Sequence, residues 1–196
     1  MKKIKEILIG TNNTGKYKEI CLLLPKKVKK HSPKNFKLKT PPEIGKSFKE
    51  NSLIKATYFS KKSNLICLSD DSGLEIDILN KSPGIYSARW SGEKNNFNQA
   101  IKKVFREIKK KKKNKKIIRA RFICSLTLYW PNGKSYSSKG MINGKISMTK
   151  RGKKGFGYDP IFIPNGHNKT FGEISPKLKM TIDHRYKAYD KIKKFF

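Results

Sequence analysis

Apolar residues along this chain gather in short runs whose spacing alternates between the period of a strand and that of a helix. Residues 4–9 form a mostly apolar run that leads into Gly10 and predicts a strand. A polar stretch follows at 11–16, and apolar positions then return at helical spacing at Tyr17, Ile20, Leu23 and Leu24. The chain therefore opens with a strand, a polar loop and a helix whose N-terminus points at the loop.

A basic connector and a capped helix come next. Residues 25–42 are typical of a connector, with one short strand at 36–39. Ser47 suits a helix N-cap, and Glu50 stands three positions later, as in a capping box, which makes Glu50 structural. We expect this helix to bury Phe48, Leu53, Ile54, Ala56, Thr57 and Tyr58.

Around residue 70 the pattern predicts a strand, a turn and a second strand. Residues 65–68 are a continuous apolar run, and residues 74–78 alternate between apolar and acidic positions, as in a half-exposed strand. Two aspartates and a Ser-Gly pair stand between these runs. This order places Asp71 and Ser72 where the first strand ends and the backbone turns.

The second half of the chain alternates apolar segments with basic loops at 109–116 and 150–155. Residues 119–130 and 134–141 predict two strands joined by a Pro-Asn-Gly hairpin turn. A helix predicted over 95–109 would bury Ala100, Ile101, Val104, Phe105 and Ile108. Ser175-Pro176 begins another helix, and a last helix over about 182–195 would bury Ile182, Tyr186, Tyr189 and Ile192.

Composition indicates a folded chain of enzyme size with an extreme positive charge. The 196 residues fit one domain or one two-lobed unit, and their formal net charge is +33. Such a charge attracts polyanions, whether nucleic acid, membrane surface or nucleoside phosphate. The excess is almost wholly lysine, which lacks the forked geometry of arginine, so it argues against sequence-specific reading of nucleic acid.

Cysteine usage and hydropathy indicate a reducing compartment. Cys21, Cys67 and Cys124 are odd in number and far apart, which favours small buried side chains over disulfides. The N-terminal apolar run is too short for a signal peptide, and no stretch approaches the length of a membrane span. We therefore expect a cytoplasmic protein that does not enter a membrane.

Acidic residues are scarce and concentrated. Six of the fourteen fall between positions 43 and 77: Glu43, Glu50, Asp70, Asp71, Glu75 and Asp77. Mg2+ takes one or two carboxylates together with water and substrate phosphates. Asp71 at a strand end suits this ion, and Glu43, outside the capped helix, has no local role that keeps it from facing a metal. The alternative is an Asx-turn in which Asp71 and Ser72 only satisfy backbone donors.

The loop after the first strand is suited to phosphate. Backbone N–H groups and the helix dipole both favour an anion at a helix N-terminus. The stretch Gly10 to Lys16 matches Gly-x-x-x-x-Gly-Lys, but Tyr17 stands where a P-loop needs a Ser or Thr hydroxyl for Mg2+. We therefore favour a phosphate-binding loop of another kind, with a P-loop or a plain capped helix start as alternatives.

Three separated blocks together resemble the inosine triphosphate pyrophosphatase family, the dITP/XTP pyrophosphatases. The first is Thr-Asn-Asn-Thr-Gly-Lys at 11–16. The second, within 69–89, is Ser-Asp-Asp-Ser-Gly-Leu with Ser-Pro-Gly-Ile-Tyr-Ser-Ala-Arg. The third is Gly-Phe-Gly-Tyr-Asp-Pro-Ile-Phe at 155–162, leading to His184-Arg185. Their order and spacing resemble the family along nearly the whole chain.

The resemblance implies a fold, an assembly and a reaction. The fold would be a mixed α/β domain covering residues 1–196, with two lobes around a long curved sheet and a nucleotide cleft between the lobes. The assembly would be a homodimer. The reaction would be hydrolysis of the non-canonical purine nucleoside triphosphates ITP, dITP and XTP to the monophosphate and pyrophosphate, with Mg2+ as the cofactor.

Carried over by position, the resemblance also assigns residues. Asp71 would be the general base and, with Glu43, a carboxylate of the Mg2+ site. Ser72 would touch the substrate, and Lys179 would reach the phosphate or the base. The triphosphate would be cradled by Thr11, Asn12, Asn13, Thr14, Gly15 and Lys16. The purine would be held by Phe156, Gly157, Tyr158, Asp159, His184 and Arg185.

Base recognition has a simple chemical requirement. Hypoxanthine and xanthine carry a 6-oxo acceptor where adenine carries an amino donor, so a donor such as Arg185 or a backbone N–H would select them. Three positions depart from the family pattern and bear on this geometry: Asp183 where Ser is usual, Gly172 where Ala is common, and Met180 in place of a polar residue.

Two alternative functions also fit parts of the sequence. The charge of +33 with interleaved aromatic residues is compatible with a basic nucleic-acid-binding protein, although the acidic cluster would repel a phosphate backbone from the proposed site. A nucleotide kinase built on the near P-loop Gly10–Lys16 is the second alternative. It would transfer a γ-phosphoryl group and release no pyrophosphate.

Overall fold

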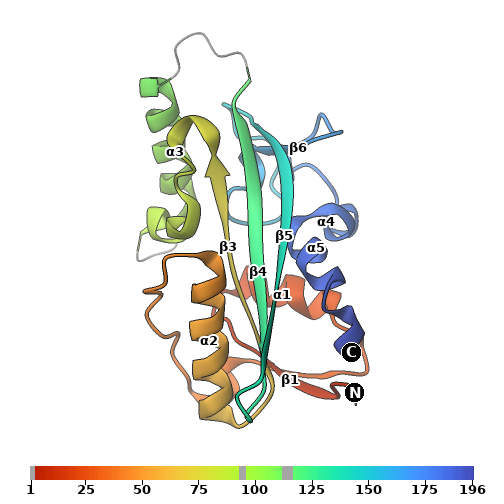
Figure 1. The fold of residues 1–196 in the computed structure, drawn as a ribbon. Coiled ribbons are helices and arrows are strands. Elements are labelled where there is room, and N and C mark those ends of the chain that lie inside the picture. The colour runs from red at the N-terminus through yellow and green to blue at the C-terminus, as the bar shows by residue number, and fades with distance from the viewer. Residues whose placement is uncertain (1–2, 93–95, 112–116) are drawn as a thin grey trace. The chain divides into compact units, whose positions relative to one another are not determined.

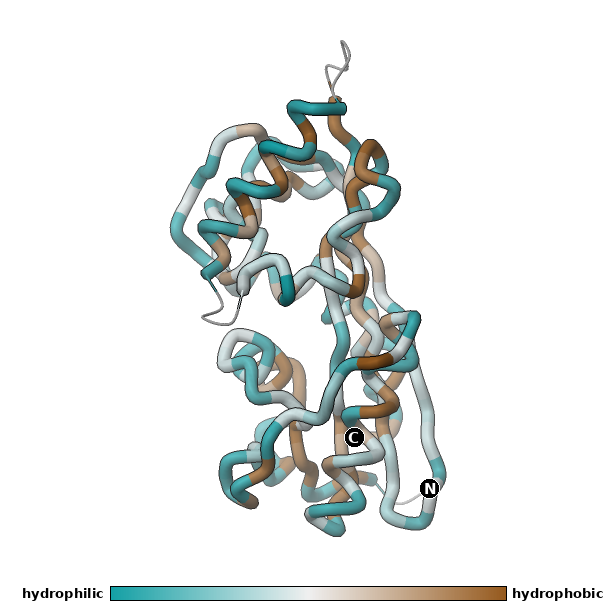
Figure 2. The backbone as a smooth tube through the Cα atoms, turned by 90° about the vertical axis from the view of Figure 1, so that its left-hand side faces the viewer, coloured by the Kyte–Doolittle hydropathy of each residue, from teal (hydrophilic) through white to brown (hydrophobic). Residues whose placement is uncertain are grey.

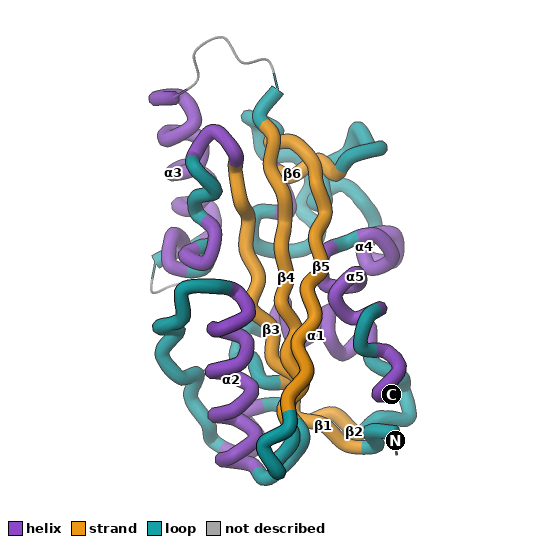
Figure 3. Tube along the Cα trace, viewed as in Figure 1, coloured by secondary structure: helices purple, strands orange, loops and turns teal. Residues whose placement is uncertain are grey.

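The computed structural model describes residues 3–92, 96–111 and 117–196. Within these ranges the chain has the expected mixed α/β fold, with five α-helices and one six-stranded sheet (Figures 1 and 3). The strand order is β2-β1-β3-β4-β5-β6. None of the helices in the described ranges combines the length and the apolar character needed to cross a membrane.

The sheet is mixed in direction. β1 pairs in parallel with both β2 and β3, whereas β5 and β6 pair antiparallel. The strands are β1 (Glu6–Ile9), β2 (Lys29–His31), β3 (Cys67–Ile76), β4 (Arg119–Tyr129), β5 (Ser135–Ile146) and β6 (Phe162–Pro164). The helices are α1 (Thr14–Leu23), α2 (Phe48–Ser63), α3 (Phe97–Lys111), α4 (Pro176–Ile182) and α5 (His184–Asp190).

The chain divides into two compact units, and β3, β4 and β5 contribute residues to both. The first unit comprises Met1–Asp71, Cys124–Gly140 and His184–Phe196. The second comprises Ser72–Ile123 and Met141–Asp183. Each unit has its own hydrophobic core, built from different stretches of the same long strands.

In the first unit helices cover both faces of the sheet, because successive side chains of a strand point to opposite faces. Leu8 and Cys67 pack against Phe59 of α2. The positions next to them in sequence turn to the other face, where the core includes Ile9, Leu68, Ile20 of α1 and Ala188 of α5. This alternation decides which helix each side chain of β3 can reach.

The second unit packs α3 against the remaining parts of the long strands. The side of α3 that carries Ala100, Ile101, Val104 and Ile108 is buried, as expected, and Phe105 lies at its edge, half-buried. Figure 2 shows the amphipathic pattern as alternating brown and teal along this helix. The same core includes Leu74, Ile76, Phe122, Phe162 and Phe171.

The predicted turn at Asp71 and Ser72 is wrong. β3 runs without interruption from Cys67 to Ile76, so both residues lie inside a strand rather than at its end. The Asx-turn alternative fails for the same reason. Strand pairing and burial on both faces hold this polar stretch extended, although its local turn propensity favours a break.

The buried side of α2 also differs from the prediction. Ser47 caps the helix by accepting a hydrogen bond from the Glu50 N–H, as expected. Leu53, Ile54, Thr57 and Tyr58 are only half-buried, however. The fully buried positions, besides Phe48, Ala56 and Phe59, are polar: Asn51, Ser52, Lys55 and Ser60. The reason is that α2 faces polar groups of the sheet, such as Thr127, whose hydroxyl lies 2.8 Å from that of Ser52.

Several boundaries need smaller corrections. Residues 36–39 form no strand; the connector instead holds β2 and a short 3-10 turn at Pro33–Phe36. The helix predicted to start at Ser175-Pro176 is α4, which Ser175 caps. The last helix, predicted over about 182–195, is shorter: α5 ends at Asp190, and a 3-10 turn follows at Lys193–Phe195. Of its expected buried residues only Ile192 is fully buried. The strand expected over 134–141 extends as β5 to Ile146.

Predictions on two short stretches fall partly on residues that the structure does not describe. The start of the helix expected over 95–109 lies outside the described residues at position 95. The basic loop expected over 109–116 begins as the last turn of α3, and its remainder, 112–116, lies outside the described residues.

Candidate active site

Asp70 and Asp71 lie next to each other in β3 and point to opposite faces of the sheet. Asp71 faces α2, on the same side of the strand as Cys67, four positions earlier. Asp70 faces α1 and α5, on the same side as Leu68, two positions earlier. Both residues are buried: Asp70 is 0% exposed and Asp71 is 4% exposed. A buried carboxylate is costly unless it is paired, so the partners on each face define what each aspartate can do.

On the α2 face, Asp71 belongs to a cluster with Glu43, Lys55 and Asn51. The Lys55 ammonium forms an ion pair with Glu43 and lies 3.6 Å from Asp71 Oδ1. The Asn51 amide donates to the other oxygen, Asp71 Oδ2, at 3.2 Å. Lys55 is 3% exposed. The two carboxylates that the sequence assigned to a metal site therefore converge on one cation.

Burial and charge set the protonation of this cluster. Burial raises the pKa of Asp71 above its ordinary value, and the nearby ammonium groups of Lys55 and Lys16 offset this only in part. For Glu43, burial acts in the same direction, but the Lys55 ammonium outweighs it and the pKa falls. Burial also opposes the charge of Lys55, yet the carboxylates of Asp71 and Glu43 raise its pKa. Asp71 is thus the more basic of the two carboxylates.

On the opposite face, Asp70 belongs to a buried ion network with Arg185, Glu19 and Lys16. The Arg185 guanidinium lies 3.3 Å from Asp70 Oδ2 and also pairs with Glu19 of α1. The Lys16 ammonium lies 3.3 Å from Asp70 and 4.0 Å from Asp71. Arg185 is 1% exposed. This network ties α1 and α5 to β3 and places Lys16 beside both aspartates.

The polar loop at 11–16 lies next to this pair of aspartates because β1 and β3 are parallel neighbours. Ile9 is in register with Leu68, so the residues that follow each of them emerge at the same place. Gly10 allows the close approach: a Cβ there would collide with the Ser69 hydroxyl and lie 2.7 Å from Cys67 Sγ. The Ser69 hydroxyl donates to the Gly10 carbonyl at 3.0 Å.

Half of the predicted loop is the first turn of a helix. α1 begins at Thr14, and Asn13 caps it by accepting a hydrogen bond from the Lys16 N–H. Gly15 and Lys16 are therefore helical. The capped helix start, which we had kept as an alternative, describes the local geometry, and it leaves the helix dipole directed at the preceding residues, where it favours an anion.

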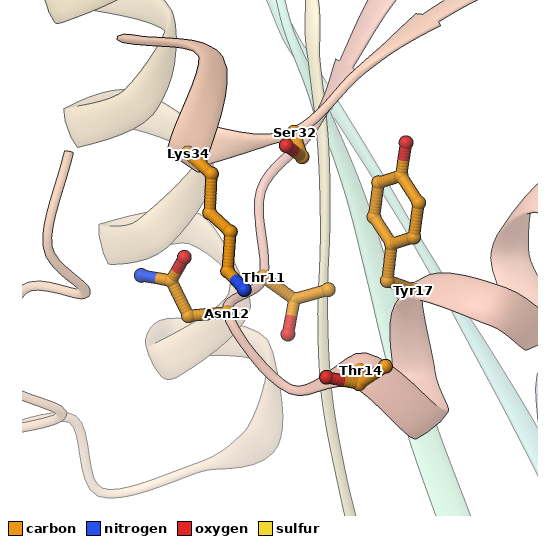
Figure 4. Close-up of a pocket in the computed structure, with 6 residues that line it drawn as sticks. All are labelled: Thr11, Asn12, Thr14, Tyr17, Ser32 and Lys34. Atoms are coloured by element: carbon orange, nitrogen blue, oxygen red, sulfur yellow. The ribbon is translucent and has the colours of Figure 1, made fainter. Parts of the chain in front are cut away.

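A pocket of about 200 Å³ opens beside this helix start. Figure 4 shows its lining and the side chain of Lys34, whose ammonium points toward the loop with Thr11 and Asn12. The lining residues are Thr11, Asn12, Thr14, Tyr17, Ser32 and Lys34. Each of these side chains carries a hydroxyl, an amide or an ammonium group, and such groups can donate hydrogen bonds to a phosphate.

The donor set around Glu43 and Asp71 fits a hard divalent cation. Carboxylate oxygens are the ligands that Mg2+ prefers, and one or two of them suffice when substrate phosphates supply others. Both side chains already contact one positive charge, that of Lys55. In the described part of the chain no three His, Cys, Asp or Glu side chains are placed to hold a metal by themselves.

The second unit brings together five of the residues assigned to the purine and the phosphate. The Asp159 carboxylate accepts from the Phe156 N–H at 2.8 Å and from the Lys179 ammonium at 2.6 Å. That ammonium lies 5.3 Å from the centre of the Phe156 ring. Gly155 and Gly157 both have positive φ, at 71° and 66°, so the tight loop around Asp159 requires them.

Tyr158 is fixed by packing in this loop. It is 3% exposed, and its hydroxyl donates to the Ser87 carbonyl at 3.0 Å. Burial raises its pKa.

The two remaining assigned residues lie in different units. Ser72 lies in β3 at the start of the second unit, half-buried. His184 begins α5 in the first unit and is 4% exposed.

Comparison with known proteins agrees with the resemblance seen in the sequence. The sequence model of the Ham1 family matches residues 7–195. The chain belongs to the Ham1 family. It is 41% identical over 185 residues to the dITP/XTP pyrophosphatase of Rhodospirillum centenum, covering 93% of this chain and 90% of that protein. It is 37% identical over 200 residues to the dITP/XTP pyrophosphatase of Bacillus subtilis, covering 97% and 96%.

Solved structures of the Ham1 family share the fold. The HAM1 protein from Coxiella burnetii superposes with a TM-score of 0.87 at 33% identity, covering 97% of this chain and 98% of that one. The Ham1 protein of Staphylococcus aureus gives 0.82 at 34% identity, covering 97% of each chain. The predicted family and fold class are therefore confirmed.

Sequence reasoning missed several residues that this Ham1 family chain places in the site. Asn51 and Lys55 contact Asp71, yet both were passed over because only apolar positions were assigned to the buried side of α2. Their spacing carried a signal, since positions 48, 51, 52, 55 and 59 follow one helical face. Glu19 and Lys34 gave no comparable signal, because only the fold brings them near Arg185 and Thr11.

Proposed function

We propose that this chain hydrolyses the non-canonical purine nucleoside triphosphates ITP, dITP and XTP to the monophosphate and pyrophosphate, and so removes them from the nucleotide pool. One observation carries the proposal. Two carboxylates, the half-buried Glu43 and the buried Asp71, converge beside two lysines, Lys16 and Lys55, in a family whose relatives named above are dITP/XTP pyrophosphatases.

The first unit binds the triphosphate. Residues 11–16 supply backbone and side-chain donors at the helix N-terminus, and Lys16 supplies a positive charge. The pocket beside them adds the ammonium of Lys34 and the hydroxyl of Ser32. A triphosphate carries about four negative charges, so this concentration of donors and cations is what its binding requires.

Asp71 acts as the general base on the attacking water. General-base help of this kind contributes roughly 100- to 10,000-fold. Lys16 and Lys55 offset the charge that develops on the phosphates. Glu43 and Asp71 would hold Mg2+, which supplies further charge neutralisation and orients the phosphate oxygens. Water then attacks the α-phosphorus, and pyrophosphate leaves.

The resemblance assigns recognition of the purine to Phe156, Gly157, Tyr158, Asp159, His184 and Arg185. It assigns Lys179 to the phosphate or the base. Ser72 is assigned a substrate contact. The Arg185 guanidinium pairs with Asp70 and Glu19 inside the first unit, so a backbone N–H is the alternative to Arg185 as the donor to the 6-oxo group. An unsatisfied donor against adenine can lower the rate by roughly 10,000-fold.

The two alternative functions are not favoured. The relatives are named as pyrophosphatases, and neither a nucleic-acid-binding protein nor a kinase is among those compared above. The proposal includes three further points. Residues 1–196 form a single domain, two copies of the chain form a homodimer, and the protein acts in the cytoplasm. Sedimentation of the purified protein at several concentrations tests the assembly separately from the reaction.

Product analysis with a nucleotide panel tests the proposal. The purified protein is incubated with ITP, XTP, GTP and ATP, with and without Mg2+, and pyrophosphate and inorganic phosphate are measured separately. We expect pyrophosphate from ITP and XTP in the presence of Mg2+, much less from GTP and ATP, and none after chelation. Release of inorganic phosphate in place of pyrophosphate, or equal rates on all four nucleotides, would contradict the proposal.

A further inference from the structure

Asn51 links the two segments that carry the carboxylates of the site. It lies on α2 with no exposed surface. Its amide nitrogen donates to Asp71 Oδ2 at 3.2 Å, and its amide oxygen accepts from the Gly45 backbone N–H at 2.8 Å. The orientation of the amide follows from these partners, because an ionised carboxylate only accepts and a backbone N–H only donates.

The Gly45 contact places Asn51 against the segment that carries Glu43, two residues earlier. The approach is close: a Cβ on Gly45 would lie 2.7 Å from the Asn51 amide oxygen. One turn further along α2, Lys55 contacts Glu43 and Asp71 Oδ1. Asp71 thus directs one oxygen to Asn51 and the other toward the positive charge that it shares with Glu43.

An amide is the side-chain group that meets both demands at once. It has a donor and an acceptor at the same end and no net charge, so it can bond a carboxylate on one side and a backbone N–H on the other. A longer or shorter polar side chain cannot span both partners, and an apolar one would leave a buried carboxylate oxygen and a buried N–H unsatisfied. The Asp71 carboxylate alone would need only a donor, and the Gly45 N–H alone would need only an acceptor, whereas the amide of Asn51 supplies both.

We propose that Asn51 is a positioning residue, which fixes the orientation of Asp71 and its separation from Glu43 so that the two carboxylates present a pre-arranged site for a divalent cation. This inference rests on the proposed function, because it assigns Asn51 a part in the same site. It makes Asn51 a support for the metal ligands rather than a ligand itself.

Metal binding without substrate tests the inference. Mn2+ is titrated against the full-length protein in the absence of nucleotide, and free Mn2+ is measured by electron paramagnetic resonance. Loss of a residue that orients a metal ligand typically weakens metal affinity 10- to 100-fold. We expect Asn51→Ala to weaken Mn2+ binding at least about tenfold and to lower kcat for ITP, while KM for ITP changes less than about twofold.

Ser60→Ala is the matched control. Ser60 is also fully buried on α2. Its hydroxyl donates to the Leu65 carbonyl at 2.7 Å, so this hydrogen bond is directed away from the cluster around Asp71. It should lose stability in urea, as Asn51→Ala does, and bind Mn2+ as the wild type does. Gly45→Ala keeps Asn51 but places a Cβ 2.7 Å from its amide oxygen, so it disturbs the contact between Asn51 and the segment with Glu43 and should weaken Mn2+ binding as well.

The outcomes separate the inference from the proposed function. Equal Mn2+ affinity in the wild type, Asn51→Ala and Gly45→Ala, or no Mn2+ binding by the wild type, would overturn the inference. If Asn51→Ala does not fold, Gly45→Ala decides by the same measurement. A wild type that binds Mn2+ and releases no pyrophosphate from ITP would overturn the proposed function and leave the role of Asn51 in the cation site supported.

Discussion

The two faces of β3 in the first unit use the same residue type for different purposes. Asp70 and Asp71 are consecutive aspartates, both buried, and yet their partners differ in kind. On its face, Asp70 meets the guanidinium of Arg185 and the ammonium of Lys16. On the other face, Asp71 meets Asn51 and an ammonium, that of Lys55, which Glu43 also uses.

The difference lies in the kind of partner that each aspartate has. Asp70 meets the guanidinium of Arg185, which also pairs with Glu19, so this network holds α1 and α5 to the sheet. Asp71 meets a neutral amide, the Lys16 ammonium at 4.0 Å and the Lys55 ammonium, which Glu43 also contacts. Two carboxylates from different segments that converge on one ammonium are placed to hold a divalent cation as well. One face is therefore suited to stability and the other to chemistry.

Replacing Asp71 by Asn tests the chemical face and should give the largest effect. The amide cannot accept the proton of the attacking water, so turnover of ITP should fall by roughly 100- to 10,000-fold. The free energy of unfolding should change by less than about 1 kcal/mol, because burial raises the pKa of Asp71 and so disfavours its ionised form in the folded protein. Pyrophosphate release and urea denaturation measure the two effects. Turnover like that of the wild type would refute the role of Asp71.

Replacing Asp70 by Asn tests the structural face. The guanidinium of Arg185, 1% exposed, would lose a charged partner inside the core. Removing one member of a buried ion pair costs about 3 kcal/mol or more, so the urea midpoint should fall well below that of the Asp71 variant. If both variants unfold at the same urea concentration, the distinction between the two faces is wrong.

Lys34→Gln tests how far the cationic side of the site extends, and we expect the smallest effect. Lys34 lines the pocket beside α1, and it is exposed, so its contact with a phosphate should contribute about 1 kcal/mol or less. This corresponds to an increase in KM for ITP of up to about fivefold with kcat unchanged.

Lys37→Gln provides the control for that measurement. Lys37 is exposed on the same segment and is not part of the pocket lining, so the substitution lowers the net charge equally. The comparison matters because a charge of +33 raises the local concentration of any triphosphate. An equal rise in KM for both variants would show that Lys34 acts only through the overall field.

Local signals predicted the parts of the site that lie close together in sequence. The polar loop between a strand and a helix, the capping serine at 47 and the concentration of carboxylates near residue 70 could all be read from neighbouring positions. Reading the buried face of α2 failed, because hydrophobic periodicity assumes that a buried side chain is apolar. Asn51 and Lys55 are buried because they contact carboxylates: Asp71 on the sheet opposite them and, in the case of Lys55, also Glu43 in the loop before α2.

The sequence alone determined the strand-loop-helix start, the family and the α/β class, and it singled out the carboxylates at 43 and 71 as candidates, because these depend on residue type and short spacing. Only the tertiary structure decided that the two aspartates serve opposite faces of one continuous strand, and that Arg185 pairs with Glu19, 166 positions away. The physical reason is that alternation along a strand becomes meaningful only when helices from distant parts of the chain cover its two faces.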